Sequence, residues 1–97
     1  MPELTYLPEV ECIVTHPDAI LNTQIIAVVD DTGNRHSLLV PKGEVTQDGG
    51  KTYLPIWVVE FDYKGRRALV ELPQEADSGT RRLWVPFVRF RPYKGTP

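Results

Sequence analysis

The chain has 97 residues, of which 41% are hydrophobic and 25% charged, and it contains nine prolines, seven glycines and one cysteine. This length predicts a single domain with one modest core, and the near-average composition excludes intrinsic disorder and fibrous repeats. One cysteine excludes an intramolecular disulfide, and the amino-terminal residues lack a secretory signal pattern. The longest apolar run has five residues. We therefore expect a cytoplasmic protein without a membrane span.

The formal net charge of −2 is unevenly distributed along the chain. Residues 1–48 carry two Lys/Arg and eight Asp/Glu, whereas residues 49–97 carry nine and five. A mixed, solvated surface is the simpler interpretation, because the halves of a sequence need not form separate faces. The alternative is a domain with one acidic and one basic face, which favours head-to-tail contacts or a polyanionic partner.

The apolar pattern is that of a β protein. Alternating and short continuous apolar runs recur, and no segment of ten residues keeps helical apolar spacing without a Pro or Gly. The predicted strands lie near residues 8–15, 24–30, 35–41, 52–62, 66–73 and 81–91. Residues 16–22, HPDAILN, have the composition of one helical turn.

Four short segments carry the residues that turns require. DDTGN (30–34) and DYKG (62–65) each begin with Asp and place Gly where a positive φ is needed. Both predict hairpins. DGG (48–50) and DSG (77–79) predict two more turns.

An internal repeat connects these elements. A shift of 32 residues lays IIAVVDDTGNRHSLLVP (25–41) over WVVEFDYKGRRALVELP (57–73), with Asp, Gly, Arg and Pro in register. This predicts two three-stranded units, 25–56 and 57–88, within one domain spanning 1–97. Chance is the alternative, because any two β-meanders share Asp, Gly and Pro at their turns. Two such units would pack as a small barrel or a two-layer sandwich of about six strands, with a long strand bent at Pro55.

The strands near 52–62 and 81–91 are apolar on both faces. One face joins the predicted core, whose members are Val10, Cys12, Val28, Leu38, Val40, Trp57, Val59, Phe61, Leu69, Trp84, Val88 and Phe90. The other face needs a cover, because a sheet with one buried face should not be apolar on both. The cover is either the chain itself or a protein partner or second copy. The predicted partner-binding residues are Leu54, Ile56, Leu83, Val85, Phe87, Arg89 and Arg91.

Basic residues among candidate exposed aromatics favour an alternative function, nucleic-acid binding. Guanidinium groups bind phosphates and aromatic rings stack on bases, which is what a single strand requires. The residues for this alternative are Lys64, Arg66, Arg67, Arg81, Arg82 and Lys94. The negative net charge and the neighbouring carboxylates argue against it, because cross-strand ion pairs can engage the arginines.

The sequence offers little catalytic chemistry. Cys12, His16 and His36 supply a nucleophile and bases, or zinc ligands together with Asp18, only if the fold brings them together. A lone Cys in an alternating strand is more typical of a core. We therefore predict no catalysis, metal or cofactor, and keep a small enzyme or metal protein that uses these residues as a remote alternative.

The segment ALVELPQEADSGTRRLWVPFVRF (68–90) resembles the closing strands of SH3-like and Tudor-like small barrels, where a VxLP strand, a turn and a WVP strand follow one another. The resemblance implies a peptide- or nucleic-acid-binding module. It departs from these barrels in one respect, since no aromatic cage for methylated lysine can be assigned residue by residue. The predicted function is a non-catalytic binding or protein-interaction module.

Overall fold

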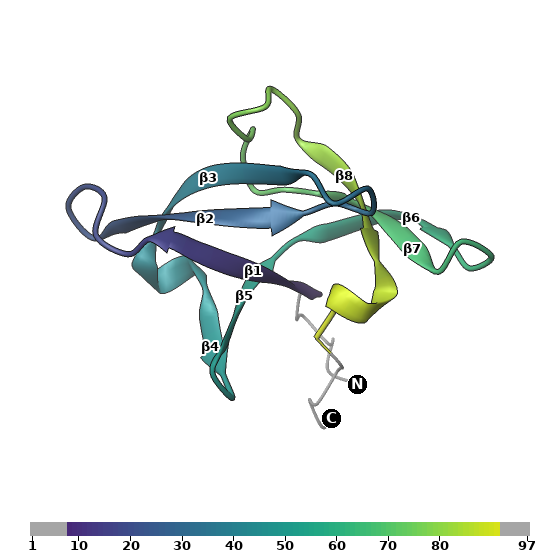
Figure 1. Ribbon diagram of the computed structural model, residues 1–97, viewed down its shortest axis with the longest axis horizontal. Coiled ribbons are helices and arrows are strands. Elements are labelled where there is room, and N and C mark those ends of the chain that lie inside the picture. Colours follow the sequence, from purple (N-terminus) through teal and green to yellow (C-terminus); the bar gives the residue numbers. More distant parts are fainter. Residues whose placement is uncertain (1–7, 92–97) are drawn as a thin grey trace, which may run out of the picture.

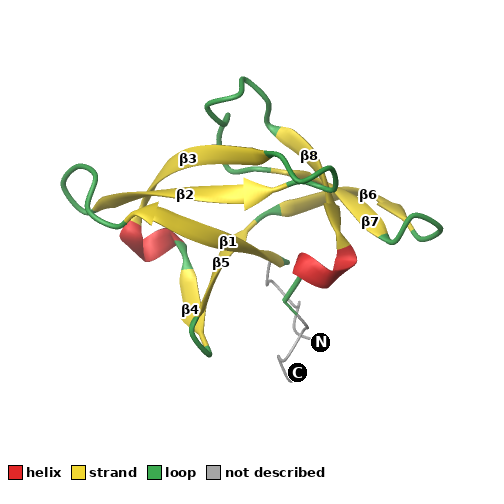
Figure 2. Ribbon diagram, in the orientation of Figure 1, coloured by secondary structure: helices red, strands yellow, loops and turns green. Residues whose placement is uncertain are grey.

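The computed structural model describes residues 8–91 and shows an all-β protein, as predicted (Figures 1 and 2). Within these residues the elements are β1 (Glu9–His16), β2 (Thr23–Val29), β3 (Arg35–Pro41), the 3-10 helix η1 (Lys42–Glu44), β4 (Thr46–Asp48), β5 (Lys51–Pro55), β6 (Trp57–Asp62), β7 (Arg67–Glu71), β8 (Arg82–Pro86) and the 3-10 helix η2 (Phe87–Arg89). None of the helices found there could cross a membrane.

The strands form two antiparallel sheets. The larger sheet has the order β3-β2-β1-β5-β4 and the smaller has the order β6-β7-β8. The chain passes from one to the other at Ile56, directly after Pro55, so the strand predicted to bend at Pro55 divides between two sheets (Figure 1). The sheets of residues 8–91 do not close into a barrel, which was one of the two predicted arrangements.

Both sheets contribute to one hydrophobic cluster. Its buried members are Val10, Cys12, Ile26, Val28, Leu38, Val40, Leu54, Ile56, Ala68, Val70, Leu72, Ala76, Leu83 and Val85. The core residues predicted in β1, β2 and β3 are therefore confirmed. In β1 and β3 the buried apolar side chains alternate with polar or exposed ones, so the buried face of these two strands could be assigned from the pattern.

The faces of β8 and of the start of β6 are the reverse of those predicted. Four side chains expected in the core are exposed by 43–82%, namely Trp57, Val59, Phe61 and Val88. Three more are only half-buried, namely Leu69, Trp84 and Phe90. Four residues expected on the second face are instead at most 5% exposed, namely Leu54, Ile56, Leu83 and Val85. The chain itself covers this second apolar set.

A β-bulge explains why Trp57 and Phe61, which were predicted on one face of β6, lie on opposite faces. Trp57 lies opposite Glu71 and Phe61 lies opposite Ala68, with a register shift between Val58 and Glu60. Residues directly opposite each other point to the same face, so Phe61 lies on the inner face with Ala68 while Trp57 lies on the outer face. The extra residue in a bulge shifts the two-residue alternation by one position, and a sequence pattern does not reveal where this happens.

Several local predictions also need correction. The segment predicted as a helical turn, 16–22, contains the last residue of β1 followed by bends and a turn over 17–22. The strand predicted over 81–91 ends at Pro86, and η2 begins at the next residue. In the β6–β7 turn the positive φ of 56° falls on Arg66 instead of Gly65.

The two units of the predicted repeat differ in their strand pairing. β2 and β3 form a hairpin that pairs next with β1, whereas the hairpin of β6 and β7 pairs next with β8. The third strand of the first unit, β5, pairs with β1 and β4. The duplication itself stays a prediction.

Candidate functional site

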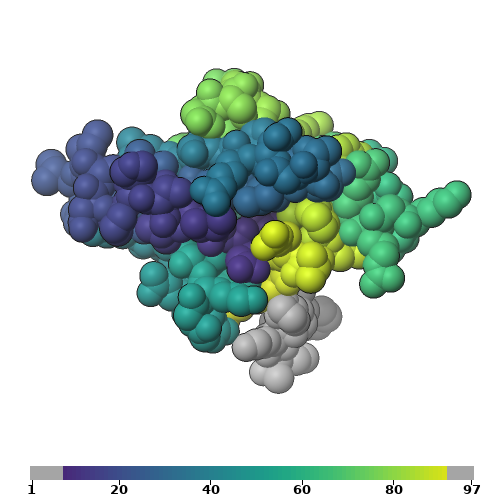
Figure 3. Space-filling model, in the orientation of Figure 1, coloured from purple at the N-terminus to yellow at the C-terminus, as the bar shows by residue number. Residues whose placement is uncertain are grey.

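The β6–β7 hairpin exposes a group of aromatic side chains. Phe61 and Tyr63 stack with ring centroids 5.4 Å apart, and Phe87 of η2 contacts both rings edge-on, at 6.4 and 5.9 Å. Tyr63 is 72% exposed and the neighbouring Val88 is 82% exposed. Figure 3 shows the hairpin, in green, projecting from the molecule, with the yellow carboxy-terminal part of the described chain near its base. We call Phe61, Tyr63, Phe87 and Val88 the aromatic surface.

Polar contacts of Asp62 hold this hairpin in its conformation. Its carboxylate accepts hydrogen bonds from the Gly65 N–H and the Arg67 Nε, both at 3.0 Å. These bonds hold the pKa of Asp62 below its usual value. A Cβ atom at Gly65 would lie 2.5 Å from the Asp62 carboxylate, which explains why the tightest point of the turn is glycine. The hairpin therefore presents its aromatic residues in one preset arrangement.

Two basic residues of the β6–β7 turn, next to the aromatic surface, have no acidic partner in the described part of the chain. Among the described residues, Lys64 and Arg66 form no ion pair within 4.0 Å. Arg66 also lines a shallow hollow, together with Gly65, Pro86 and two members of the aromatic surface. The surface therefore combines exposed rings with two unpaired positive charges.

The other basic residues of the nucleic-acid alternative are engaged elsewhere. Arg67 pairs with Asp31 and Asp62 and lies 4.3 Å above the Trp84 ring. Arg82 pairs with Glu71 at 3.0 Å. The Arg81 guanidinium donates to the carbonyl oxygens of residues 72 and 73. Lys94 lies outside the described residues.

Two of the predicted partner-binding residues remain accessible. Phe87 is half-buried within the aromatic surface, and Arg89 is exposed, 4.0 Å from Glu11. Arg91 is held by ion pairs to Glu9 and Asp48, at 2.8 and 2.9 Å. The four apolar residues of that prediction, buried as described above, belong to the core.

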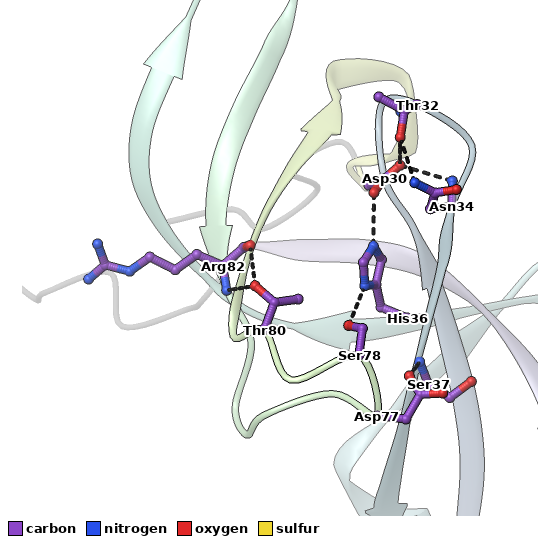
Figure 4. A network of polar contacts seen from close by, with 9 residues as sticks. All are labelled: Asp30, Thr32, Asn34, His36, Ser37, Asp77, Ser78, Thr80 and Arg82. Atoms are coloured by element: carbon purple, nitrogen blue, oxygen red, sulfur yellow. Dashed lines mark hydrogen bonds and ion pairs between the residues drawn. The ribbon is translucent and has the colours of Figure 1, made fainter.

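A second feature is a polar network centred on His36 (Figure 4). His36 is buried, and its Nε2 lies 2.8 Å from Asp30 Oδ2 while its Nδ1 lies 2.7 Å from Ser78 Oγ. The imidazole therefore connects the turn after β2 with the loop between β7 and β8. Sequence reasoning named His36 but paired it with Cys12 and His16.

The Asp30 carboxylate is fixed from its other side. Oδ1 accepts hydrogen bonds from the N–H and hydroxyl of Thr32 and from the Asn34 N–H, at 2.7–2.9 Å. Partial burial acts to raise the pKa of Asp30, but the hydrogen bonds from His36, Thr32 and Asn34 outweigh it, and the pKa lies well below its usual value. An ionised carboxylate only accepts hydrogen bonds, so Nε2 of His36 donates to it. In the neutral imidazole, Nδ1 is then free to accept from the Ser78 hydroxyl.

The loop that carries Ser78 is fastened along the edge of β3. The Asp77 N–H donates to the Ser37 carbonyl, and the Ser37 N–H donates to Asp77 Oδ1, both at 2.8 Å. The Gln74 side chain donates to the Leu39 carbonyl. These contacts satisfy backbone groups that an edge strand otherwise leaves open.

The other residues of the enzyme or metal alternative lie in ordinary environments. Cys12 is buried in the core, and burial together with the Glu11 charge raises the pKa of its thiol to about 12. His16 is exposed and contacts Thr15, while Asp18 pairs with Lys42. Residues 8–91 contain no group of three His, Cys, Asp or Glu side chains that could hold a metal ion.

The comparisons with known proteins found no relative of this chain. No family model matches the chain, and no curated protein or solved structure shows significant similarity to it. The class of protein is therefore defined by its own geometry. It is an all-β protein of two antiparallel sheets, with an exposed aromatic surface and a polar network centred on His36.

Proposed function

We propose that this protein is a non-catalytic binding module that docks a segment of a partner protein on the aromatic surface. The observation that carries the proposal is the exposure of Phe61, Tyr63 and Val88 at one site. Exposed apolar groups that gather in one place are characteristic of interaction surfaces. Aromatic residues are enriched in such surfaces because a ring offers a large contact area with few rotatable bonds.

The positive charges beside this surface indicate which charge the partner segment should carry. Lys64 and Arg66 have no acidic partner among the described residues and flank the exposed rings. A segment with an apolar anchor and nearby Asp or Glu side chains would complement both features. The finer fold assignment, an SH3-like module of two packed layers, is part of the same proposal and is supported by the core that the two sheets share.

A display selection with random peptides tests this function. The immobilised protein should enrich peptides that combine apolar and acidic residues, with affinity measured afterwards by fluorescence polarisation. Tyr63→Ala should weaken the selected peptides by about tenfold or more, as expected for an aromatic residue central to an interface. Leu21→Ala is the matched control, because Leu21 is 90% exposed in the loop between β1 and β2.

Two outcomes would overturn the proposal. One is equal binding of the selected peptides by the wild-type protein and Tyr63→Ala. The other is equal loss of affinity in Tyr63→Ala and Leu21→Ala, since the effect would then not belong to the aromatic surface.

Single-stranded nucleic acid is the second candidate ligand, favoured by the two unpaired cations beside stacked, exposed rings. The measurement is the anisotropy of a fluorescent oligo(dT) of about 12 nucleotides. Two phosphate contacts give a log–log salt slope of about −1.4, so raising salt fourfold should weaken binding about sevenfold. Replacing Lys64 and Arg66 with Gln should flatten this slope, whereas Arg82→Gln should preserve it because Arg82 is already paired with Glu71.

A further inference from the structure

The network around His36 has the geometry of an activated hydroxyl. Ser78 Oγ lies 2.7 Å from His36 Nδ1, and His36 Nε2 lies 2.8 Å from Asp30 Oδ2. Ser78 is an exposed residue of the loop between β7 and β8, whereas His36 is buried, so the base lies directly beneath a residue of the surface. A nucleophile within hydrogen-bond reach of a base that is itself oriented by a third group is the arrangement that activates serine. Figure 4 shows the imidazole between the two oxygen-bearing side chains.

The surroundings keep this arrangement in place before any ligand arrives. The Asp30 carboxylate is held by Thr32 and Asn34, as described above. The Ser78 turn is closed by a bond from the Gly79 N–H to the Ala76 carbonyl, at 2.9 Å. The same loop is fastened to β3 through Asp77. Positioning the hydroxyl against its base therefore requires no further ordering of the chain.

The molecule contains an internal comparison for this site. Thr15 Oγ1 lies 3.1 Å from Nδ1 of His16, which is also a contact between a hydroxyl and an imidazole. His16 is exposed, and among the described residues no carboxylate orients its ring. Thr15 and Ser78 thus differ in the features that activation requires.

We propose that Ser78 is a modification site that accepts an acyl group from an activated ester. Ser78 Oγ forms a bond to the carbonyl carbon while its proton passes to His36 Nδ1. The bond from that carbon to the leaving oxygen breaks, and the leaving group takes the electron pair and then the proton from His36. Asp30 keeps the imidazolium in place through Nε2. The product is O-acyl Ser78, and the inference does not depend on the proposed binding function.

p-Nitrophenyl acetate is the probe that tests this inference. The wild-type protein should release nitrophenolate and gain one acetyl group, which peptide mass mapping should locate on Ser78. Ser78→Ala should lose that release and His36→Gln should slow it by about 100-fold or more, the contribution of a positioned base. Thr15→Ala, the matched control at the other hydroxyl that contacts a histidine, should react like the wild-type protein.

Peptide mass mapping of the acetyl groups on the wild-type protein gives a test that does not depend on whether the variants fold. Faster acetylation of Ser78 than of Thr15 supports the inference. Acetyl groups confined to lysines, or equal rates at Ser78 and Thr15, would overturn it. Unchanged nitrophenolate release in a folded Ser78→Ala protein would do the same.

Discussion

The two sheets differ in how their edge strands β3 and β6 are covered. In the five-stranded sheet, the loop between β7 and β8 covers β3 and satisfies both backbone groups of Ser37 through Asp77. In the three-stranded sheet, β6 has β7 on one side, and no other strand of residues 8–91 pairs with its other side. β6 also exposes Trp57 and Phe61, each by 51%. The apolar surface open to a partner is therefore concentrated on the smaller sheet.

The irregularity of β6 indicates how a partner would use this surface. A bulge at Val58–Glu60 interrupts the regular spacing of backbone donors and acceptors along the strand. Bulges protect edges from the addition of another strand. We therefore expect a partner to contact the side chains of the aromatic surface and not to extend the sheet through backbone hydrogen bonds.

The largest expected effect is the difference in the free energy of unfolding between a substitution in the core and the same substitution in an exposed loop. Leu54→Ala removes a side chain that is 0% exposed, and it should lower the free energy of unfolding by about 2–5 kcal/mol. Leu21→Ala makes the same chemical change at a residue that is 90% exposed, and should change it by less than about 0.5 kcal/mol. Urea unfolding measures both. Equal costs would contradict the placement of Leu54 in the core.

The reactivity of Cys12 tests the burial of β1 in the larger sheet. Thiol reagents attack the thiolate, and burial raises the pKa of this thiol to about 12. Reaction with a chromogenic disulfide near neutral pH should therefore be about 100-fold slower, or more, in the folded protein than in urea. A native rate close to the unfolded rate would show that β1 is open to solvent.

The Asp30 carboxylate should give a smaller, pH-dependent effect. Asp30→Asn weakens the bonds from His36, Thr32 and Asn34, and should cost about 1–2 kcal/mol at neutral pH. The pKa of Asp30 is lower in the folded protein than its usual 3.8, so its contribution is present above that value and is lost as pH falls below it. The difference in unfolding free energy between the two proteins should shrink from pH 5 towards pH 2. A constant difference would exclude the charge as its source.

The smallest expected effect on stability belongs to the aromatic surface. Tyr63 is 72% exposed, so Tyr63→Ala should change the free energy of unfolding by less than about 0.5 kcal/mol while weakening the selected peptides. Thermal and urea unfolding check the first part, and fluorescence polarisation checks the second. A loss of stability as large as that of Leu54→Ala would make Tyr63 a structural residue.

The larger sheet could be predicted from the sequence better than the smaller one. In β1 and β3, alternation identified Val10, Cys12, Leu38 and Val40 as buried, and the structure confirms this. In the smaller sheet, the change of sheet at Ile56 and the bulge in β6 each interrupt the alternation. Because both faces are apolar there, the pattern did not say which one enters the core.

The site around His36 could not be predicted because its members are separated along the chain. Ser78 lies 42 residues from His36 and belongs to a turn motif that its Asp and Gly already explain. Asp30 likewise begins a hairpin turn.

Cross-strand ion pairing, the sequence alternative to nucleic-acid contacts, is observed for Arg82. Such an ion pair could be predicted because it depends only on which residues of two neighbouring strands lie opposite each other.

Amide chemical-shift mapping of the wild-type protein with a selected acidic and apolar peptide tests the central claim most directly. The aromatic surface predicts shifts that saturate with the peptide and cluster in residues 57–66 and 86–89. The loop at 17–22 and the covered strand β3 should remain unchanged. Saturable shifts confined to the 17–22 loop or to β3, with residues 57–66 unaffected, would contradict the account.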